Sequence, residues 1–333
     1  MILVTGGAGY IGSHTIVELL NKNFEVLVID NFSNSDVSAL ESIEKITGKS
    51  ISFIEMDLRN YDLLVEKTKE FDIEGIIHFA AYKSVGESVF EPLKYYDNNI
   101  NSLVNVLQLL KERNISNFVF SSSCTVYGSP EVIPVTEDSE VKKGESPYGK
   151  SKIICEEIVN DFNYTHSFSA INLRYFNPIG AHSSGLIGDR PIGKPNNLLP
   201  FVTQVAIGKR DVLSVFGDDY DTPDGTCLRD YIHVIDLAKA HVSAVEYNRV
   251  NHNTVIPINL GTGNGSSVLE IINTFEKVSK IKINYKINPR RKGDVPAIFG
   301  DCSLSKKLLD WEAQLSLEDM LSSAWNFEQN LKK

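Results

Sequence analysis

The chain has 333 residues, enough for about two domains of roughly 150 residues that each bury their own core. Hydrophobic residues make up 42% of it and charged residues 23%, a globular composition that excludes a disordered or low-complexity protein. The 43 acidic residues outnumber the 33 basic ones, and the formal net charge of −10 disfavours nucleic acid and anionic membrane surfaces as partners.

The four cysteines, Cys124, Cys155, Cys227 and Cys302, are far apart and form neither a CxxC pair nor a zinc-site pattern. The first residues are an apolar run followed by glycines, without the basic region of a signal peptide. No segment approaches the roughly 18 uninterrupted apolar residues of a membrane span. We therefore expect a cytoplasmic protein with reduced thiols, no metal site and no membrane contact.

In the first half of the chain, short β-branched and aromatic runs alternate with stretches of helical spacing. Several of the short runs are almost continuously apolar, which indicates strands buried on both faces. This pattern predicts an α/β fold built on a doubly wound parallel sheet of the Rossmann type. Strands are expected at 2–5, 25–29, 51–56, 75–79, 117–120 and 170–173, and helices over 13–21, 99–113 and 147–162.

After about residue 177 the sequence becomes rich in Gly, Pro, Asn and Asp, which is typical of loops. We expect a first domain over 1–176, which binds a cofactor, and a second, smaller α/β domain over 177–333, which binds the substrate. A strand-like run near 255–261 is expected to return to the first sheet. The glycines just after it have the wrong spacing for a cofactor loop and predict a turn before a helix that starts near Ser266 or Ser267.

Gly6, Gly9 and Gly12 lie between the first strand and the first helix. Glycine permits a tight turn there and lets the backbone approach a pyrophosphate, which then binds the free N–H groups at the helix N-terminus. A glycine trio can also serve any sharp turn, but its place after the first strand of an α/β chain favours a dinucleotide site.

Asp30 closes the second strand, 24 residues after Gly6. An acid near this offset binds the adenosine ribose hydroxyls of a dinucleotide and repels a 2′-phosphate. No Arg or Lys follows in 31–34 to bind such a phosphate, so the sequence predicts NAD rather than NADP. The alternative is a solvated acid at a strand end.

Ser146 and Pro147 predict a helix start, with the serine as N-cap. Tyr148 and Lys152 are then one turn apart on one helix face, and a lysine ammonium there would lower the pKa of the tyrosine toward neutrality. In isolation this spacing more often belongs to a solvated lysine beside a half-buried tyrosine. The glycine loop and the serine run 121–123, which follows a strand, favour a catalytic pair with a hydroxyl that binds a substrate alcohol.

With these motifs the sequence resembles the extended short-chain dehydrogenases/reductases and, within them, the UDP-glucose 4-epimerase family. The resemblance covers nearly the whole chain. Its most specific stretches are VTGGAGYIGSH at 4–14, IDN at 29–31, HFAAYKSVGES at 78–88, YYDNN at 95–99, SSSCTVYG at 121–128, SPYGKSK at 146–152, LRYFNPIG at 173–180 and RDYIHV at 229–234.

The resemblance implies a role for each matching residue. Tyr148 is the base, Lys152 tunes it and holds the nicotinamide ribose, and Ser123 orients the sugar hydroxyl. The implied NAD contacts are Gly6, Gly9, Tyr10, Ile11, Gly12, Asp30, Asn31, Asp57, Leu58, Phe79, Ala80, Lys83, Asn98, Tyr148, Lys152 and Tyr175. The implied UDP-hexose contacts are Ser123, Tyr148, Phe176, Asn177, Asn197, Leu198, Phe216, Arg229, Tyr231, Arg291, Asp294 and Ile298.

The implied reaction is reversible 4-epimerisation of UDP-glucose and UDP-galactose. Tyr148 takes the 4-hydroxyl proton while hydride passes from C4 to NAD⁺, and the 4-keto sugar turns over before hydride returns to its opposite face. Ile298 stands where the family varies between a bulky and a small residue, so UDP-GlcNAc and UDP-GalNAc are candidate further substrates. The family usually dimerises through helices that correspond here to 93–113 and 148–162, which implies a homodimer.

Two other functions remain as alternatives. A sugar-nucleotide 4,6-dehydratase would need an Asp-Glu pair after the serine, where this chain has Cys124 and Thr125. A non-catalytic NAD-sensing protein would keep the fold but lose catalytic residues. The sequence contains neither the H-E-x-x-H motif of a metal hydrolase nor the G-x-S-x-G motif of a serine hydrolase, and His78 lies in an apolar strand where a core role is expected.

Overall fold

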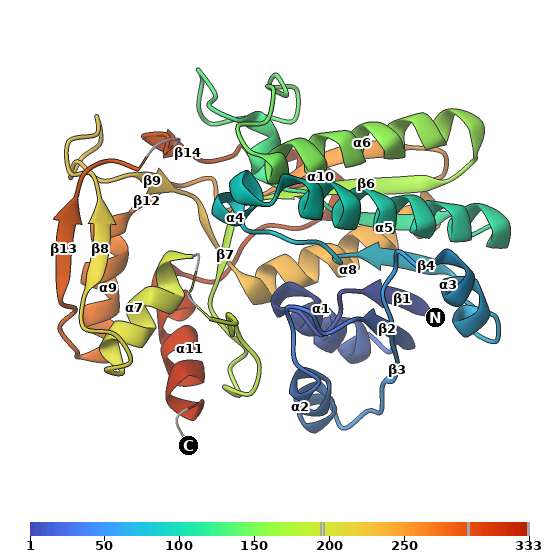
Figure 1. Ribbon diagram of the computed structural model, residues 1–333, viewed down its shortest axis with the longest axis horizontal. Coiled ribbons are helices and arrows are strands. Elements are labelled where there is room, and N and C mark those ends of the chain that lie inside the picture. Colours follow the sequence, from blue (N-terminus) through green and yellow to red (C-terminus); the bar gives the residue numbers. More distant parts are fainter. Residues whose placement is uncertain (194, 196, 292–293, 332–333) are drawn as a thin grey trace.

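The structure is a computed structural model that describes residues 1–333 except 194, 196, 292–293 and 332–333. One large sheet occupies the end of the molecule that holds the N-terminus, and small sheets occupy the other end (Figure 1). The predicted α/β fold with a doubly wound parallel sheet is confirmed.

The large sheet has seven strands in the order β11-β6-β5-β4-β1-β2-β3, and all its neighbours pair in parallel. Each predicted strand of the first half is present, with ends that differ by at most two residues. β11 comes from the second half of the chain and pairs with β6 along its whole length. The strands are β1 (Ile2–Thr5), β2 (Val26–Asp30), β3 (Ser52–Glu55), β4 (Gly75–His78), β5 (Asn117–Ser121), β6 (Ser169–Tyr175) and β11 (Val255–Leu260).

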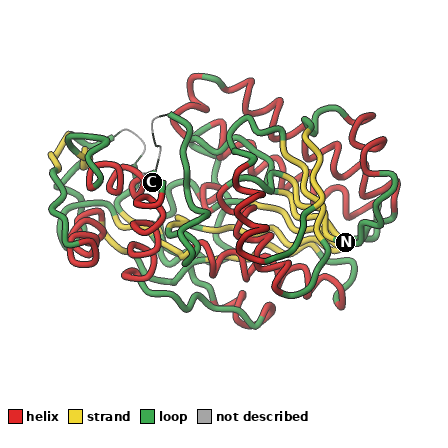
Figure 2. Tube along the Cα trace, turned by 90° about the horizontal axis from the view of Figure 1, so that it is seen from below, coloured by secondary structure: helices red, strands yellow, loops and turns green. Residues whose placement is uncertain are grey.

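Alternate residues of the strands enter two different cores, as the continuous apolar runs predict. Val4 packs into the core on one face and Leu3 into the core on the other, and both are fully buried. Figure 2 shows helices on both sides of the strands. The first face carries α1 (Tyr10–Asn21), α2 (Ser38–Thr47), α8 (Val234–Val250) and α10 (Ser303–Leu309), and the second carries α3 (Tyr61–Thr68), α5 (Pro92–Arg113) and α6 (Pro147–Thr165). The short α4 (Val85–Phe90) packs against α5 and α6.

Helix α6 begins as predicted, because Ser146 accepts a 3.1 Å hydrogen bond from the Gly149 N–H and Pro147 is its first residue. Two other helices begin earlier than the apolar spacing predicts. α1 starts directly after Gly9, its N-cap, and α5 starts at Pro92, which suits a first helical position because proline lacks an N–H.

The small sheets are β7 (Asn177–Ile179) with β10 (Tyr231–His233), β12 (Ser266–Ser267) with β9 (Leu228–Arg229) and β14 (Ala297–Ile298), and β8 (Leu213–Phe216) with β13 (Tyr285–Asn288). Residues of β7, β8 and β10 pack with α7 (Leu198–Ala206), α9 (Val268–Ser279) and α11 (Leu317–Asn330) around a separate core. Ser267 caps α9 in a reciprocal capping box with Glu270, which confirms the predicted helix start. Among the described residues, no helix is both long and apolar enough to cross a membrane.

Candidate active site

The glycine loop between β1 and α1 has no room for side chains at two positions. Gly6 has a φ of +69°, and a Cβ there would lie 2.7 Å from the Ala80 backbone nitrogen. A Cβ at Gly12 would lie 2.5 Å from the Gly6 carbonyl oxygen. The N-cap of α1 is Gly9, so no capping side chain covers the first amides of the helix. This loop therefore fits a pyrophosphate, which would approach the backbone and the helix N-terminus.

Asp30 lies at the carboxyl end of β2, beside the glycine loop. Its Oδ2 accepts a 3.0 Å hydrogen bond from the Ala8 N–H, and its Oδ1 accepts bonds from the Phe32 N–H at 2.9 Å and the Ser35 hydroxyl at 2.8 Å. A carboxylate oxygen can accept two hydrogen bonds, so Oδ2 keeps the capacity to bind a ribose hydroxyl. These contacts orient the Asp30 carboxylate, which the sequence predicts to bind the adenosine ribose of the cofactor.

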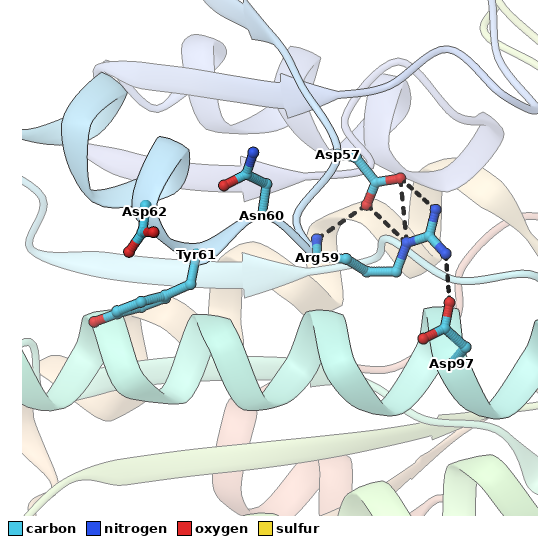
Figure 3. Close-up of a pocket in the computed structure, with 6 residues that line it drawn as sticks. All are labelled: Asp57, Arg59, Asn60, Tyr61, Asp62 and Asp97. Carbon is cyan, nitrogen blue, oxygen red and sulfur yellow. Dashed lines mark hydrogen bonds and ion pairs between the residues drawn. The ribbon is translucent and has the colours of Figure 1, made fainter.

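Asp57 lies just beyond β3 and is paired with Arg59, for which the sequence predicts no role. The Arg59 side chain donates to both Asp57 oxygens, with 2.7 Å from Nη2 to Oδ2, and also binds Asp97 (Figure 3). This pairing lowers the pKa of Asp57. Asn31, another predicted cofactor contact, donates to Asp57 at 3.5 Å. A shallow pocket surrounds the group and is lined by Asp57, Arg59, Asn60, Tyr61, Asp62 and Asp97.

Other predicted cofactor contacts lie along the same edge of the sheet. Phe79 and Ala80 directly follow β4, and Ala80 forms the wall against Gly6. The Lys83 ammonium lies 5.8 Å from the centre of the Tyr10 ring and 3.9 Å from Asp189. Two further predicted contacts have their side chains turned into the protein, since Ile11 packs against the core beneath α1 and Leu58 is buried beside β3. Asn98 donates a 3.1 Å hydrogen bond to Asn99 on α5.

Tyr148 and Lys152 are both buried and lie on the face of α6 that meets the carboxyl end of β5. Lys152 Nζ donates a 2.6 Å hydrogen bond to the Ser121 carbonyl oxygen and lies 6.0 Å from the centre of the Tyr148 ring. Ser123 is hydrogen-bonded to the Tyr148 side chain. The Ser121 hydroxyl is hydrogen-bonded to Tyr175, the predicted cofactor contact at the end of β6. The structure thus brings the predicted Ser, Tyr and Lys together.

The pKa values of this group correct one expectation. Burial raises the pKa of Tyr148 to about 12, although the hydrogen bond from Ser123 opposes the rise. The spacing of the two residues predicts that Lys152 lowers this pKa, but the lysine ammonium is directed to the Ser121 carbonyl rather than to the phenol oxygen. Burial also lowers the pKa of Lys152 to about 8, because desolvation disfavours the ammonium.

His78 has the core role that its apolar strand predicts. It is buried, its Nδ1 lies 2.8 Å from the Thr5 hydroxyl, and burial together with the nearby Lys152 charge lowers its pKa to about 3. Its imidazole is therefore neutral beside the lysine. Another buried pair, Glu156 of α6 and Arg174 of β6, lies below the serines and has no signal in the sequence.

The two arginines expected to bind a diphosphate share one carboxylate. Arg291 donates to both oxygens of Asp294, at 3.1 and 2.9 Å, and Arg229 Nη2 lies 3.9 Å from Asp294 Oδ1. Arg229 is also fixed by hydrogen bonds from Nη1 to the carbonyls of Leu228 at 2.8 Å and Val295 at 2.9 Å. Arg229 lies in β9, and Arg291 and Asp294 lie in the segment that leads into β14. β14 pairs with β9 in parallel.

The remaining predicted substrate contacts come from the small sheets, from α7 and from the segment between β6 and β7. Phe216 ends β8, and its ring centre lies 5.4 Å from the Arg291 guanidinium. Asn177 begins β7 and pairs with Tyr231 of β10, while the exposed Asn197 and the half-buried Leu198 begin α7. Phe176 and Ile298 are buried in one cluster with Cys124. All these residues lie within the described part of the chain.

A second buried acid next to Arg229 was not predicted as functional. Asp230 accepts hydrogen bonds from the N–H groups of Thr262 at 2.8 Å, Gly263 at 3.1 Å and Gly300 at 3.4 Å. It thereby ties β9 and β10 to the glycine turn after β11. Its only signal in the sequence is its place inside the RDYIHV stretch.

A parallel sheet with a glycine loop after β1, an acid after β2 and a buried Ser-Tyr-Lys group after β5 defines the extended short-chain dehydrogenase/reductase class. A family model described as GDP-mannose 4,6 dehydratase matches residues 3–324. The UDP-glucose 4-epimerase of Haemophilus influenzae is 51% identical over 333 residues, which is 100% of this chain and 98% of that protein. The chain belongs to the UDP-glucose 4-epimerase family.

Other relatives and solved structures agree. The UDP-glucose 4-epimerase of Bacillus subtilis is 49% identical over 330 residues, 99% of this chain and 97% of that protein. The crystal structure of the Bifidobacterium longum enzyme in complex with NAD⁺ and UDP has a TM-score of 0.95 and 47% identity, and covers 99% of this chain and 98% of that one. The Stenotrophomonas maltophila enzyme, with NAD and formylated UDP-arabinopyranose, has a TM-score of 0.97 and 43% identity at 99% and 98% coverage.

Proposed function

We propose that this protein interconverts UDP-glucose and UDP-galactose by reversible 4-epimerisation with bound NAD. The observation that carries the proposal is the buried group of Ser123, Tyr148 and Lys152 at the carboxyl edge of the sheet, beside a glycine loop. Relatives about half identical over the whole chain are UDP-glucose 4-epimerases, and similar solved structures contain NAD.

The chain's own residues fit NAD. Gly6 and Gly12 leave the space that a pyrophosphate needs, and Asp30 offers a carboxylate oxygen to the adenosine ribose. When bound, NAD supplies the acceptor and donor of the C4 hydride and a cationic nicotinamide ring that favours a phenolate. The negative charge of Asp30 opposes a 2′-phosphate, which favours NAD over NADP.

The proton chemistry belongs to Tyr148. As phenolate it takes the proton of the sugar 4-hydroxyl, and it returns that proton when the 4-keto sugar is reduced on its opposite face. Ser123, already bonded to the phenol, orients the same sugar hydroxyl. Because burial raises the pKa of Tyr148, positive charge near the phenol oxygen is needed for it to act as a base.

The substrate's diphosphate binds Arg229 and Arg291. Each guanidinium can hold phosphate oxygens in a bidentate way, which compensates for the protein's negative net charge. Asp294 holds both arginines and reaches toward the ribose. Phe216 and Tyr231 contact the uracil, and the other contacts are Phe176, Asn177, Asn197 and Leu198. Ile298 borders the sugar, where its intermediate size permits some conversion of UDP-GlcNAc and UDP-GalNAc.

A dehydratase activity, which the description of the family model suggests, lacks its second acid and base here. Elimination of the 6-hydroxyl needs groups that exchange protons near neutral pH. The two residues after Ser123 are Cys124 and Thr125, and burial raises the pKa of Cys124 to about 12. Epimerisation, which needs no elimination, is therefore favoured.

The exposed apolar surface supports a homodimer, and we propose that the protein acts in the cytoplasm. Val89, Phe90 and Leu93 expose 58%, 84% and 79% of their surface on α4 and the start of α5, beside α6. A contiguous exposed apolar patch of this kind favours a protein interface. We also propose that the chain divides near 176 into an NAD-binding and a UDP-sugar-binding domain, with β11 belonging to the first.

The test is proton NMR of the anomeric region after separate incubation with UDP-galactose and UDP-GalNAc, with no NAD added. We expect conversion to the gluco epimer from the NAD that the protein retains. Tyr148→Phe is the control, and it should lose turnover while keeping its fold and NAD. If neither substrate is converted even after NAD is supplied, the proposed function is wrong.

A further inference from the structure

A buried ion pair lies directly beneath the serine segment 121–123. Glu156 is one turn after Lys152 on α6, and Arg174 lies in β6. Arg174 donates from Nε to both carboxylate oxygens, at 3.0 and 3.2 Å, and from Nη2 to Oε2 at 2.6 Å. The two side chains are 6% and 7% exposed. Burying two charges is costly, and such a pair is weak evidence for stability by itself, so its place in the fold calls for another explanation.

The Glu156 carboxylate reaches the middle residue of the serine segment. The Ser122 hydroxyl donates to Glu156 Oε1, and Ser122 is fully buried. The two neighbouring serines contact the reactive group. The Ser121 carbonyl oxygen accepts a hydrogen bond from Lys152, and Ser123 is hydrogen-bonded to Tyr148. Three successive serines thus connect to three side chains of one helix, α6.

Arg174 anchors the other side of the pair. Its Nη1 donates to the Tyr127 hydroxyl at 3.1 Å and to the Glu137 carbonyl at 3.3 Å, and the Tyr127 hydroxyl donates to Asn259 of β11 at 2.7 Å. The network therefore joins α6, β6, β11 and the 3₁₀ turn (Cys124–Tyr127) that follows the serines. A buried polar network with its partners in place is rigid and specifies one arrangement.

We propose that Glu156 is a positioning residue for the reaction, which holds Ser122 so that Ser121 and Ser123 meet Lys152 and Tyr148. This inference rests on the proposed function. Glu156 touches no reacting atom in this role. It acts through the backbone of the serine segment, which would otherwise be free to shift at the end of β5 relative to α6. An error of about 1 Å in such a group costs on the order of a hundredfold in rate.

The charge of Glu156 has a second effect, on Lys152. Glu156 raises the pKa of Lys152 against the lowering caused by burial. Other titratable groups facing the lysine are His78 of β4 and Cys155 and Tyr148 of α6. Burial moves their pKa values to about 3, 12 and 12, so all three are uncharged near neutral pH. Removal of the Glu156 charge should therefore lower the pH at which Lys152 loses its proton.

Ser122→Ala removes the hydrogen bond between Ser122 and Glu156 alone, because Glu156 keeps its bonds to Arg174. We expect kcat on UDP-galactose to fall about tenfold or more, while KM stays within about twofold and the melting temperature and NAD content stay unchanged. The matched control is Ser305→Ala on α10, also a fully buried serine, whose hydroxyl donates 2.7 Å to the Cys302 carbonyl. It should leave kcat unchanged. A Ser122→Ala enzyme with the kcat of the unaltered protein would overturn the proposal.

Glu156→Gln tests the effect on Lys152 through the pH dependence of kcat, which a purely structural role of Glu156 would leave unchanged. It should lower kcat and shift the alkaline fall of the kcat profile to lower pH, whereas Ser122→Ala should leave the position of that fall unchanged. If the Glu156→Gln enzyme has full kcat and its kcat falls at the same alkaline pH as in the unaltered protein, the proposal is contradicted.

A crystal structure of the Ser122→Ala protein tests the geometry separately from the activity. Ser123 should move away from Tyr148. An unmoved Ser123 would contradict the proposal even if the unaltered protein fails to epimerise.

Discussion

The Lys152 ammonium donates a 2.6 Å hydrogen bond to the carbonyl oxygen of Ser121 and so joins α6 to the carboxyl end of β5. The bond connects the helix that carries Tyr148 to the strand that leads into Ser123. It also directs the ammonium away from the phenol, whose pKa burial raises to about 12. In this arrangement the lysine fixes the position of α6 relative to the serine segment.

Lys152→Met should abolish most of the activity with little cost in stability. Methionine fills similar space but supplies neither the charge nor the hydrogen bond to Ser121, so we expect kcat to fall by about 10²–10⁴. Because a buried ammonium is replaced by an apolar side chain, the melting temperature should stay unchanged or rise. Steady-state kinetics and thermal unfolding measure both. A variant with half of the original kcat would show that the lysine is dispensable.

The activity should decline in mildly alkaline solution. Burial lowers the pKa of Lys152 to about 8, so the ammonium, which is the form that the reaction needs, is lost as the pH rises through about 8. With NAD bound, where the cationic nicotinamide ring favours the Tyr148 phenolate below that pH, we expect kcat to fall as the pH rises above about 8, as measured in overlapping buffers. The Lys152→Met enzyme is the control, since its residual rate should lack this step. A constant kcat up to about pH 10 would contradict the assignment.

Arg229→Ala should weaken substrate binding without affecting NAD. Arg229 is held by the carbonyls of Leu228 and Val295, so its guanidinium is ordered before the diphosphate arrives. Loss of a charge-assisted contact worth about 1.5–3 kcal/mol should raise KM about 10- to 100-fold. Arg290→Ala is the matched control, because Arg290 pairs with Asp219 and has no predicted role. Equal KM values for the two variants would exclude Arg229 from the diphosphate site.

Ile298→Tyr should separate the two classes of substrate. Ile298 is 7% exposed and packs with Cys124 and Phe176, next to the serine segment. A tyrosine there would occupy the space that a 2-N-acetyl group requires, so UDP-GalNAc conversion should disappear while UDP-galactose conversion remains. Ile298→Val, which keeps the volume nearly unchanged, is the control. Unchanged UDP-GalNAc turnover in the tyrosine variant would refute this role.

Asp30→Ala should release the cofactor. It removes the ribose acceptor and three hydrogen bonds that order the loop, from Ala8, Phe32 and Ser35. We expect at least about tenfold weaker NAD binding, measured as the NAD freed when the purified protein is denatured. Asp36→Ala, an exposed acid on the same segment, is the control and should retain its NAD. Full retention in the Asp30 variant would place the ribose elsewhere.

Much of this protein is determined by local sequence. Three such features are the glycine spacing after β1, the acid that ends β2 and the Ser146 cap before Tyr148 and Lys152, and each of them acts within a few residues of its own position. Their geometry follows from backbone sterics and helix periodicity, so the sequence predicts the turn, the sheet edge and the shared helix face.

Only the tertiary structure decided which charged side chains pair with one another and how burial shifts their pKa values. Arg229 of β9 lies beside Asp294, Arg59 reaches Asp97 of α5, and Glu156 pairs with Arg174 beneath Ser122. None of these pairings follows from spacing, since each depends on how separate elements pack. The pKa of Tyr148 shows the same limit: the spacing to Lys152 predicts a fall, but burial raises it, because desolvation of the phenolate depends on the whole surrounding fold.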